Sequence, residues 1–387
     1  MRRIGTEERR ARLVTRHRLS PCRSDDVVDA VRSIVALHST DPASVFLSAL
    51  ARTRGFEPAQ LEHALYEQRS LVRMLGMRRT LFVVPRELVP VVDAAASRAV
   101  AAQERRKLER FLAENGVADA GAWIDDASTA ALEALAARGE ASTTELSGDH
   151  PLLGERVRIG TGTRWETEVG AASRILLLLA VEGAIVRDRP RGSWVASHYR
   201  WVPSERLGPL EPLSPEQGRQ ELLRRWLAAF GPGTEADIRW WTGWTARDAR
   251  AALTGVPHAV VDLEGARGYV LADDVEPVPS PEPAAALLPS LDASVMGWKE
   301  RDWYLGAHVG AIFDRNGNAG PTVWWEGRIV GGWVQRPDGE IAFRVLEDVG
   351  AAGEGAIAGE AERLERWLGD VRVTPRFRTP LERELRG

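Results

Sequence analysis

The sequence predicts an α+β fold in which three similar helical units precede a C-terminal antiparallel β region. Two observations carry this expectation. An order of three helices and a hairpin recurs through residues 1–275, and short strands separated by glycines replace it further on. The chain has 387 residues, which is too long for one ordinary core, so several units that share interfaces are expected.

The first unit is predicted from capping residues and apolar spacing. A first helix is expected over residues 24–37, and Asp41 followed by Pro42 predicts the start of a second one. A third helix is expected over residues 58–68, and LVRMLGM and TLFVVP are typical of a hairpin. A long helix over about residues 86–115 should link this unit to the next.

The second unit repeats the same order. The run STAALEALAAR, which begins at Ser128, has helical apolar spacing and ends at Gly139. Ser142 and Glu145 form a capping-box pattern that opens another helix. A third helix is expected over residues 168–182, and AIVRD and SWVASHYRWV predict the hairpin.

The third unit follows the proline-rich break LGPLEPLSP. Its first helix is expected over residues 215–230. Thr234 with Asp237, and Thr245 with Asp248, predict the starts of two more helices because each pair places an acid three residues after a capping hydroxyl. HAVVDL and GYVLADD predict the closing hairpin.

Beyond the linker PVPSPEP the pattern changes. VGAIFD, TVWWEG, RIVGGWV and EIAFRVL are predicted strands of a small antiparallel barrel, followed by a helix over about residues 354–368. The expected boundaries are 1–85 for the first unit, 86–124 for the linker helix, 125–208 and 209–275 for the second and third units, and 276–387 for the barrel with its helix.

Three helices followed by a two-stranded wing describe a winged helix, a variant of the helix-turn-helix. That motif usually places its third helix in the major groove of DNA, although some copies are scaffolds or protein-binding modules. The formal net charge of −4 hides basic clusters at residues 1–20 and 98–110 and in the last sixteen residues. Such clusters either bind phosphates or form solvated helix faces.

Composition excludes several classes of protein. The longest apolar run, Ile175–Val181, is too short to span a bilayer, and the N-terminus lacks the apolar stretch of a signal peptide. The single cysteine, Cys22, rules out a disulfide scaffold, and the scattered histidines form no metal-binding pattern. We therefore expect a cytoplasmic protein, associated with the nucleoid if it binds DNA, that is monomeric and needs no metal or cofactor.

The candidate chemistry lies in the turn after the first helix. His38, Ser39, Thr40 and Asp41 follow one another there, and an imidazole, two hydroxyls and a carboxylate could orient and activate a water molecule. The spacing after Ile34 puts His38 on or near the buried face of that helix. In the alternative interpretation, Asp41 only caps the next helix and His38 is a satisfied, half-buried residue.

The residues of this turn resemble a known family. The segment ALHSTDPASVFLSALAR resembles the LQAQDP-type turn of the AlkZ/YcaQ-like DNA glycosylases, winged-helix DNA-binding proteins also known as the HTH_42 superfamily. MRRTLFVVP, LLPSLDASVMGWKERDWYL and FDRNGNAGPTVWWEGRIVGGWV are similar to its actinobacterial members. The resemblance covers nearly the whole chain and implies three tandem winged helices plus a β-barrel.

The resemblance also implies an activity. Members of the family excise N7-alkylated purines from DNA, and their catalytic motif is Gln-x-Gln or Gln-x-Asp. The matching positions here are His38 and Thr40, followed by Asp41, so we expect these three residues to be catalytic. The expected reaction is hydrolysis of the N-glycosidic bond of N7-alkylated guanine, bulky natural-product adducts included, in base excision repair or antibiotic self-resistance.

The expected partner is double-stranded DNA that carries such adducts. We expect DNA contacts from Arg78 and Arg79 of the MRRT segment, and from Arg315, Asn316 and Asn318 at a hairpin tip that could otherwise be a plain polar turn. Two alternatives remain. One is a non-catalytic winged-helix DNA-binding protein, either a regulator or a drug-sequestering factor, and the other is a protein-interaction scaffold.

Overall fold

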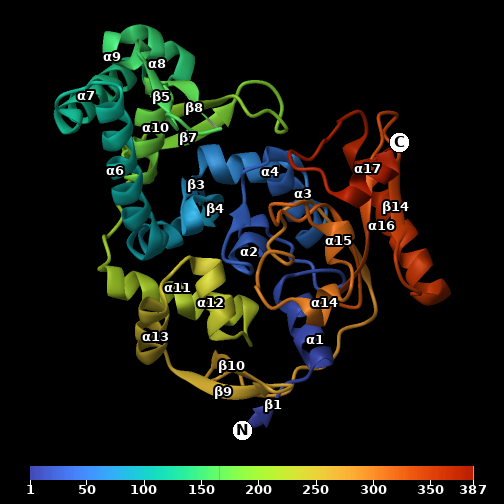
Figure 1. Cartoon of the computed structure of the whole chain (residues 1–387). Coiled ribbons are helices and arrows are strands. Elements are labelled where there is room, and N and C mark those ends of the chain that lie inside the picture. Colours follow the sequence, from blue (N-terminus) through green and yellow to red (C-terminus); the bar gives the residue numbers. More distant parts are fainter. Residues whose placement is uncertain (165, 387) are drawn as a thin grey trace.

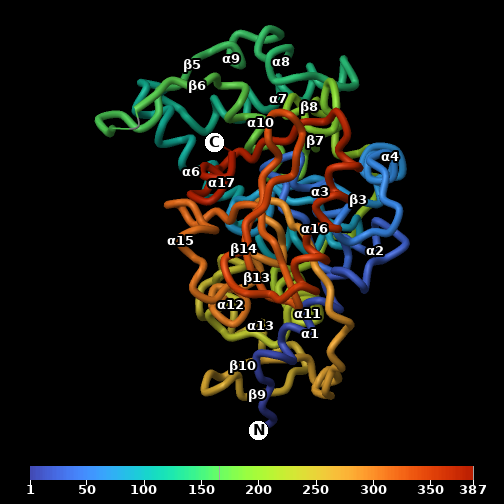
Figure 2. Tube along the Cα trace, turned by 90° about the vertical axis from the view of Figure 1, so that its right-hand side faces the viewer, coloured from blue at the N-terminus to red at the C-terminus, as the bar shows by residue number. Residues whose placement is uncertain are grey.

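A computed structural model describes residues 1–164 and 166–386 of the chain (Figure 1). The first unit occupies the centre of the molecule, the second lies at one end, and the third lies beside the N-terminus. The C-terminal region packs along one side of the first unit, and Figure 2 shows from a second direction that it runs almost the full length of the molecule. No described helix is long and apolar enough to cross a membrane.

The first unit contains the predicted helices and hairpin, with one correction. Its elements are α2 (Val27–Arg32), α3 (Pro42–Arg52), α4 (Pro58–Glu62), the π-helical turn η1 (His63–Glu67), β3 (Leu71–Leu75) and β4 (Leu81–Pro85). The first helix stops at Arg32, because Val35 adopts a left-handed φ of 65° that turns the chain out of the helix. Leu37 and His38 then form a short strand, β2 (Leu37–His38), which pairs with β4 and gives the sheet order β2-β4-β3.

A series of helical turns leads from the first unit to the second. It consists of η3 (Arg86–Leu88), α5 (Val89–Val92), the π-helical turn η4 (Asp93–Ser97) and α6 (Arg98–Glu114), so the expected linker helix is a mixture of helix types. The first helix of the second unit starts earlier than the expected Ser128. The elements of this unit are α7 (Ala120–Arg138), α8 (Thr143–Asp149), α9 (Pro151–Gly154), β5 (Arg156–Ile159), β6 (Thr167–Gly170), α10 (Ala171–Val181), β7 (Ile185–Pro190), β8 (Tyr199–Pro203) and the 3-10 turn η5 (Ser204–Leu207).

Two features of the second unit differ from the sequence prediction. A β5–β6 hairpin precedes α10, so Glu168 lies in a strand and not in the third helix. The capping box at Ser142 is confirmed, because the Ser142 side chain accepts from the Glu145 N–H while the Glu145 carboxylate accepts from the Ser142 N–H. Most apolar side chains of the second unit form a core with those of α6, separate from the large core of the first unit and the C-terminal region, although Trp194 belongs to the large core.

The third unit agrees well with its capping signals. It contains α11 (Pro215–Phe230), α12 (Glu235–Thr242), α13 (Ala246–Gly255), β9 (His258–Leu263) and β10 (Ala266–Leu271). The N-terminus completes this unit in a way that local pattern did not reveal. The strand β1 (Arg2–Arg3) pairs in parallel with β9, and α1 (Thr6–Arg16) packs on α11.

The C-terminal region corrects the expected barrel. It contains β11 (Ala285–Leu288), α14 (Asp302–Leu305), α15 (Val309–Ile312), β12 (Thr322–Trp325), β13 (Arg328–Gln335), β14 (Ile341–Val345), α16 (Gly350–Leu368) and α17 (Pro380–Arg386). The sheet order is β11-β12-β13-β14, and within the described residues β11 and β14 do not pair with each other, so the sheet is open. Val309–Ile312 of VGAIFD form the short helix α15 and not a strand, and this helix contacts α17.

Candidate functional site

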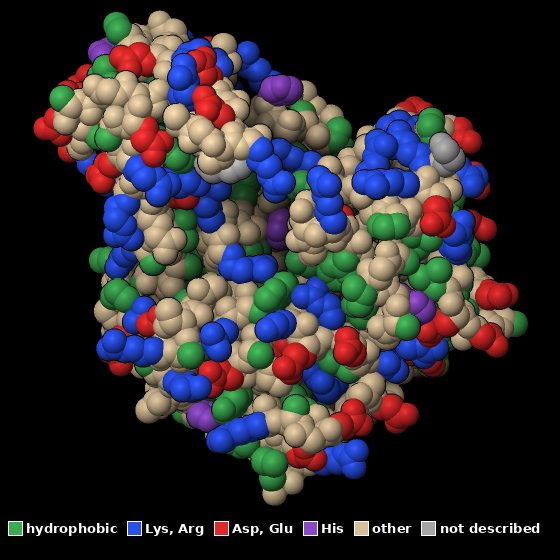
Figure 3. Space-filling view, in the orientation of Figure 1, with side chains coloured by type: hydrophobic (Ala, Val, Ile, Leu, Met, Phe, Trp, Pro, Cys, Tyr) green, Lys and Arg blue, Asp and Glu red, His purple; other side chains and the backbone are tan. Residues whose placement is uncertain are grey.

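An open cleft of about 700 Å³ brings together residues of the first unit, the third unit and the C-terminal region. Its lining includes His38 of β2, Arg78 of the β3–β4 turn, Trp240 of α12, the segment around Arg301, and the turn from Asp314 to Asn318. Figure 3 shows Lys and Arg side chains gathered around the hollow at the centre of this face. Five of the eight predicted site residues line this cleft: His38, Arg78, Arg315, Asn316 and Asn318.

The sequence had suggested that His38 ends a helix. In the structure it is positioned by strand pairing instead. It lies opposite Phe82 of β4, and the two rings meet edge to face with centroids 5.6 Å apart. The backbone N–H of Thr40 lies 3.5 Å from Nδ1, which is a long hydrogen bond. Burial, reinforced by the nearby Arg78 guanidinium, lowers the pKa of His38 to about 4, so its imidazole is neutral at physiological pH.

Arg78 is fixed by the third unit. Its guanidinium lies 4.2 Å from the centre of the Trp240 ring, and the guanidinium of Arg301 lies 4.7 Å from the same ring. Arg78 has a left-handed φ of 54°, and Gly243 at the end of α12 lies so near that a Cβ there would come within 3.1 Å of the Arg78 side chain. Arg78 and Val35 therefore both hold uncommon backbone conformations next to His38, and such strain is often found at functional sites.

The wall opposite His38 is the turn between α15 and β12. The Asp314 carboxylate accepts hydrogen bonds from the backbone N–H groups of Asn316 and Asn318 and from the Asn318 side chain. These bonds keep the turn closed and, against the effect of partial burial, lower the pKa of Asp314. Arg315 and Asn316 are exposed at its tip and border the cleft.

The segment at Lys299–Asp302 contributes residues that sequence reasoning missed. The buried Asp237 carboxylate on α12 accepts from the backbone N–H groups of Lys299 and Glu300 at 2.9 and 2.8 Å, which brings this segment to the cleft. Lys299, Arg301 and Asp302 all line it. The charged run KERD between two tryptophans was the sequence feature that could have indicated these residues. Nothing in the sequence showed that this run would meet the first and third units at the cleft.

The other three predicted site residues lie away from the cleft. Asp41 is 6 % exposed, and its two oxygens accept from the backbone N–H groups of Ala43 and Arg376 at 3.1 and 3.2 Å. Burial raises the pKa of Asp41, and these two bonds oppose that shift. Thr40 does not line the cleft, and Arg79 pairs with Glu104 of α6 at 2.8 Å.

The cations of the cleft have no acidic partners. Within the described residues, Arg78, Lys299, Arg301 and Arg315 make no ion pair, although Asp302 and Asp314 also line the cleft. A water-accessible groove with several uncompensated positive charges attracts a polyanion. The cleft therefore combines a neutral imidazole with a surface suited to phosphate groups.

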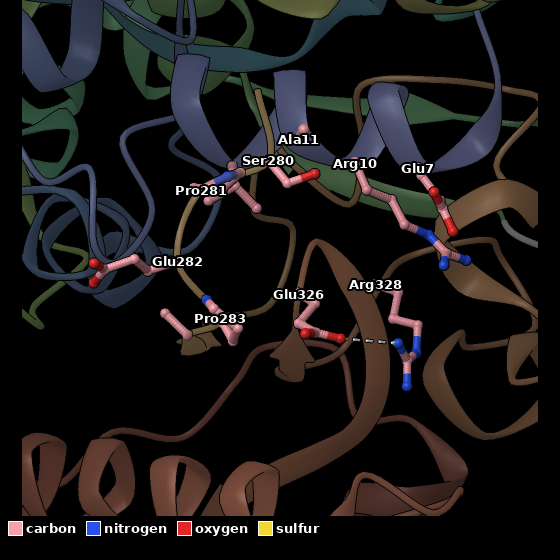
Figure 4. A pocket seen from close by; sticks show the side chains of 11 residues that line it. Glu7, Arg10, Ala11, Ser280, Pro281, Glu282, Pro283, Glu326 and Arg328 are labelled. Carbon is pink, nitrogen blue, oxygen red and sulfur yellow. Dashed lines mark ion pairs between the residues drawn. The ribbon is translucent and has the colours of Figure 1, made fainter. Parts of the chain in front are cut away.

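A second hollow, of about 260 Å³, lies between α1, the proline-rich linker and the β12–β13 turn (Figure 4). Its ionisable groups include three carboxylates, those of Glu7, Glu282 and Glu326, and two guanidinium groups. Glu326 and Arg328 form an ion pair at 3.6 Å. This balance does not favour a polyanion. No cluster of three or more potential metal ligands occurs in the described part of the chain.

Comparisons with known proteins agree with this picture. A family model described as "DNA glycosylase AlkZ-like" matches residues 31–367. The structure is similar to that of a Streptomyces sahachiroi protein, "DNA glycosylase AlkZ", with a TM-score of 0.75 and 18 % sequence identity over 96 % of this chain and 98 % of that one. A search among curated proteins found no match.

The family match and the cleft together define the class of protein as a DNA glycosylase, an enzyme that acts on DNA. The chain belongs to the AlkZ-like DNA glycosylase family.

Proposed function

We propose that this enzyme hydrolyses the N-glycosidic bond of N7-alkylated guanine in double-stranded DNA, with His38 placing the attacking water molecule. The observation that carries the proposal is a neutral imidazole in a cleft whose cations are unpaired. Specialised roles in base excision repair or antibiotic self-resistance are both consistent with this reaction.

The chemistry explains why so few groups are needed. Alkylation at N7 gives the purine a positive charge, so the base leaves as a neutral molecule without protonation by an acid. The enzyme then has to stabilise an oxocarbenium-like sugar and hold a water molecule at C1′. A neutral His38 can hydrogen-bond to that water, whereas a protonated imidazole would repel both the modified base and the sugar cation.

A carboxylate near the sugar would stabilise its developing positive charge. Asp41 is poorly suited to this role because its oxygens already bind backbone N–H groups. Asp302 lines the same cleft as His38, is exposed, and makes no ion pair within the described residues. We therefore assign the stabilising charge to Asp302, and we assign to Asp41 the positioning of α3 and of the segment at Arg376.

The openness of the cleft suits a bulky adduct, since a large alkyl group prevents the base from entering a closed pocket. Met296, Leu305, Val309 and Phe313 supply apolar lining beside the cations. We assign DNA contacts near the lesion to Arg78, Arg315, Asn316 and Asn318, which line the cleft, whereas the ion pair of Arg79 leaves it less free to bind DNA.

The test is release of free base from duplexes that carry either N7-methylguanine or a bulky N7-alkyl adduct. We expect the wild-type protein to release the modified base, and His38→Ala to be about 100-fold slower because it removes the group that holds the water. His63→Ala is the matched control, since His63 is an exposed histidine paired with Glu67 on η1. Equal rates for His38→Ala and wild type would show that His38 takes no part in the reaction. Binding of DNA without release of any modified base would instead support the alternative of a non-catalytic DNA-binding protein.

A further inference from the structure

Two arginines from distant parts of the chain meet at Tyr199 outside the His38 cleft, and the charge of a third acts on one of them. The two are Arg73 of β3 and Arg187 of β7, and the third is Arg376 in the segment before α17. The guanidinium groups of Arg73 and Arg187 lie 4.6 and 5.1 Å from the centre of the Tyr199 ring. Their charges are therefore within about 10 Å of each other, roughly one Debye length at 0.1 M salt.

The charge of this cluster is not balanced by acids. Arg73 is 4 % exposed, yet within the described residues its guanidinium donates one hydrogen bond, from Nη1 to the Tyr66 hydroxyl at 3.4 Å, and its Nε has no partner. Arginine is almost never buried unless it is paired. Within the described residues neither Arg73 nor Arg187 nor Arg376 makes an ion pair.

Carboxylates at the same interface bind other arginines. Asp188 of β7 pairs with Arg69 at 2.7 Å, and Glu62 of α4 pairs with Arg189 at 3.0 Å. The acids nearby are thus already engaged, and the three arginines of the cluster remain uncompensated. The hydroxyl of Tyr199 is also buried without a hydrogen-bond partner, so both donors and charge are unsatisfied at this point.

Repulsion within the cluster is visible at Arg187. Burial lowers the pKa of this guanidinium, and the charges of Arg73 and Arg376 lower it further, while the Tyr199 ring opposes the shift. Packing three like charges together costs free energy in the unliganded protein. A bound anion would offset that cost.

An anion can reach Arg187 through a hollow of about 650 Å³ that Arg187 and Tyr199 line, whereas Arg376 lines a separate hollow. Ser142, Thr143 and His198 line the same hollow and can donate hydrogen bonds. Glu145 also lines it, but its carboxylate pairs with Arg191 and Arg200 and accepts from the Ser142 N–H.

The cluster connects with the His38 cleft through the chain around Arg376. Asp41, three residues after His38, binds the Arg376 backbone N–H at 3.2 Å. Arg376, Arg378 and Arg383 line a basic hollow of about 500 Å³ that shares Arg315 and Asn316 with the His38 cleft. Positive side chains therefore run from the cleft to the three-arginine cluster.

We propose that Arg73, Arg187 and Arg376 bind one phosphate of the DNA backbone. The site would hold the duplex at the interface between the first and second units while the lesion lies at His38. This inference rests on the proposed function for the identity of the ligand, but its test uses undamaged DNA and does not depend on base release.

The test is the affinity for an undamaged duplex, measured by fluorescence anisotropy over a range of salt concentrations. Arg187→Gln and Arg376→Gln should each weaken binding about five- to tenfold at low salt and reduce the slope of log K against log salt by about 0.9. The double variant should reduce the slope by no more than about 0.9 as well, because the arginines share one phosphate. Arg366→Gln is the control, since Arg366 is exposed on α16 and makes no ion pair within the described residues.

A second measurement separates ligand binding from a structural role. Neither Arg187→Gln nor Arg376→Gln should lower the melting temperature, because each relieves repulsion between like charges. Salt slopes equal to those of wild type and Arg366→Gln would overturn the proposal. A second outcome would also overturn it. If inorganic phosphate raised the melting temperature of the wild-type protein more than chloride at equal ionic strength, and both variants kept the wild-type salt slope, the site would bind a small free anion and not DNA.

Discussion

The arginines of α1 and those of the His38 cleft look alike in the sequence but differ in their surroundings. Arg12 is 1 % exposed and binds Glu8 and Asp274, and Arg16 binds Asp274 as well. Arg78 and Arg301 border open space, and within the described residues they contact aromatic rings, Trp240 for both and Phe313 for Arg301, but form no ion pair. Arg12 and Arg16 of the basic N-terminus are thus paired with acids, while the cations of the cleft remain available to a ligand.

The difference teaches that pairing, and not arginine content, decides which cluster can bind DNA. The charge of a paired guanidinium is neutralised by an acid of the same protein, and removing that acid destabilises the fold. An unpaired guanidinium at a groove contributes to the field that a polyanion meets. The following predictions test this contrast.

The largest effect is expected where a pair is fully buried. Arg52 of α3 and Asp292 are both 0 % exposed and form a two-bond ion pair, and Ser48 also donates to Asp292. Asp292→Asn leaves a buried, uncompensated guanidinium, so the free energy of unfolding should fall by about 3–5 kcal/mol. Urea denaturation measures this change. A loss below about 1 kcal/mol would show that the pair is not important for stability.

The next effect concerns the two carboxylates of the proposed mechanism. Asp302→Asn should slow base release by about 10- to 100-fold while leaving the melting temperature unchanged, because it removes negative charge from the cleft and no structural bond. Asp41→Asn should lower the free energy of unfolding by about 1 kcal/mol, because an amide has one acceptor oxygen for the two backbone N–H groups that Asp41 binds. The assignment fails if Asp41→Asn abolishes release in a stably folded protein while Asp302→Asn has no effect.

A smaller effect is expected from one unpaired cation. Arg301→Gln should weaken DNA binding about tenfold and leave the urea midpoint unchanged, because Arg301 makes no ion pair with the described residues. Anisotropy titrations and urea denaturation on the same preparations provide both values. If stability falls and affinity does not, Arg301 belongs with the arginines of α1.

The smallest effect is expected from pH in the neutral range. The folded-state pKa of His38 is lowered to about 4, so its imidazole stays neutral from pH 8 to about 5.5, and base release per bound complex should be nearly constant. Release should fall as the pH drops through about 4. Because the unfolded chain binds the His38 proton more tightly than the folded protein does, the free energy of unfolding should fall as the pH drops from about 6.5 towards 4. Arg78→Gln should move the acid limb to higher pH, and an unmoved limb would contradict the assignment to His38.

Much of the fold was predictable from short-range signals. The caps at Ser142, Thr234 and Thr245 begin helices as expected, and the glycine and proline breaks fall between elements. These signals work because a side-chain cap satisfies backbone N–H groups of its own first turn. The order of three helices and a hairpin was legible for the same reason.

The errors arose where distant segments decide the local structure. β2 forms because β4 offers a partner to Leu37 and His38, β1 forms on a strand some 260 residues away, and VGAIFD becomes helical. The barrel was expected from strands alone, but the pairing of its edges is a property of the assembled sheet. Sequence periodicity contains none of this information.

The sequence by itself determined that the chain is a mixed α and β protein of the AlkZ-like family and that His38 is a residue to examine. Only the tertiary structure decided that His38, Arg78 and Asp302 share one cleft while Asp41 supports the segment at Arg376. The reason is physical. A residue type and its local cap depend on neighbours in the chain, whereas burial, pKa and the pairing of a charge depend on groups that folding brings from elsewhere.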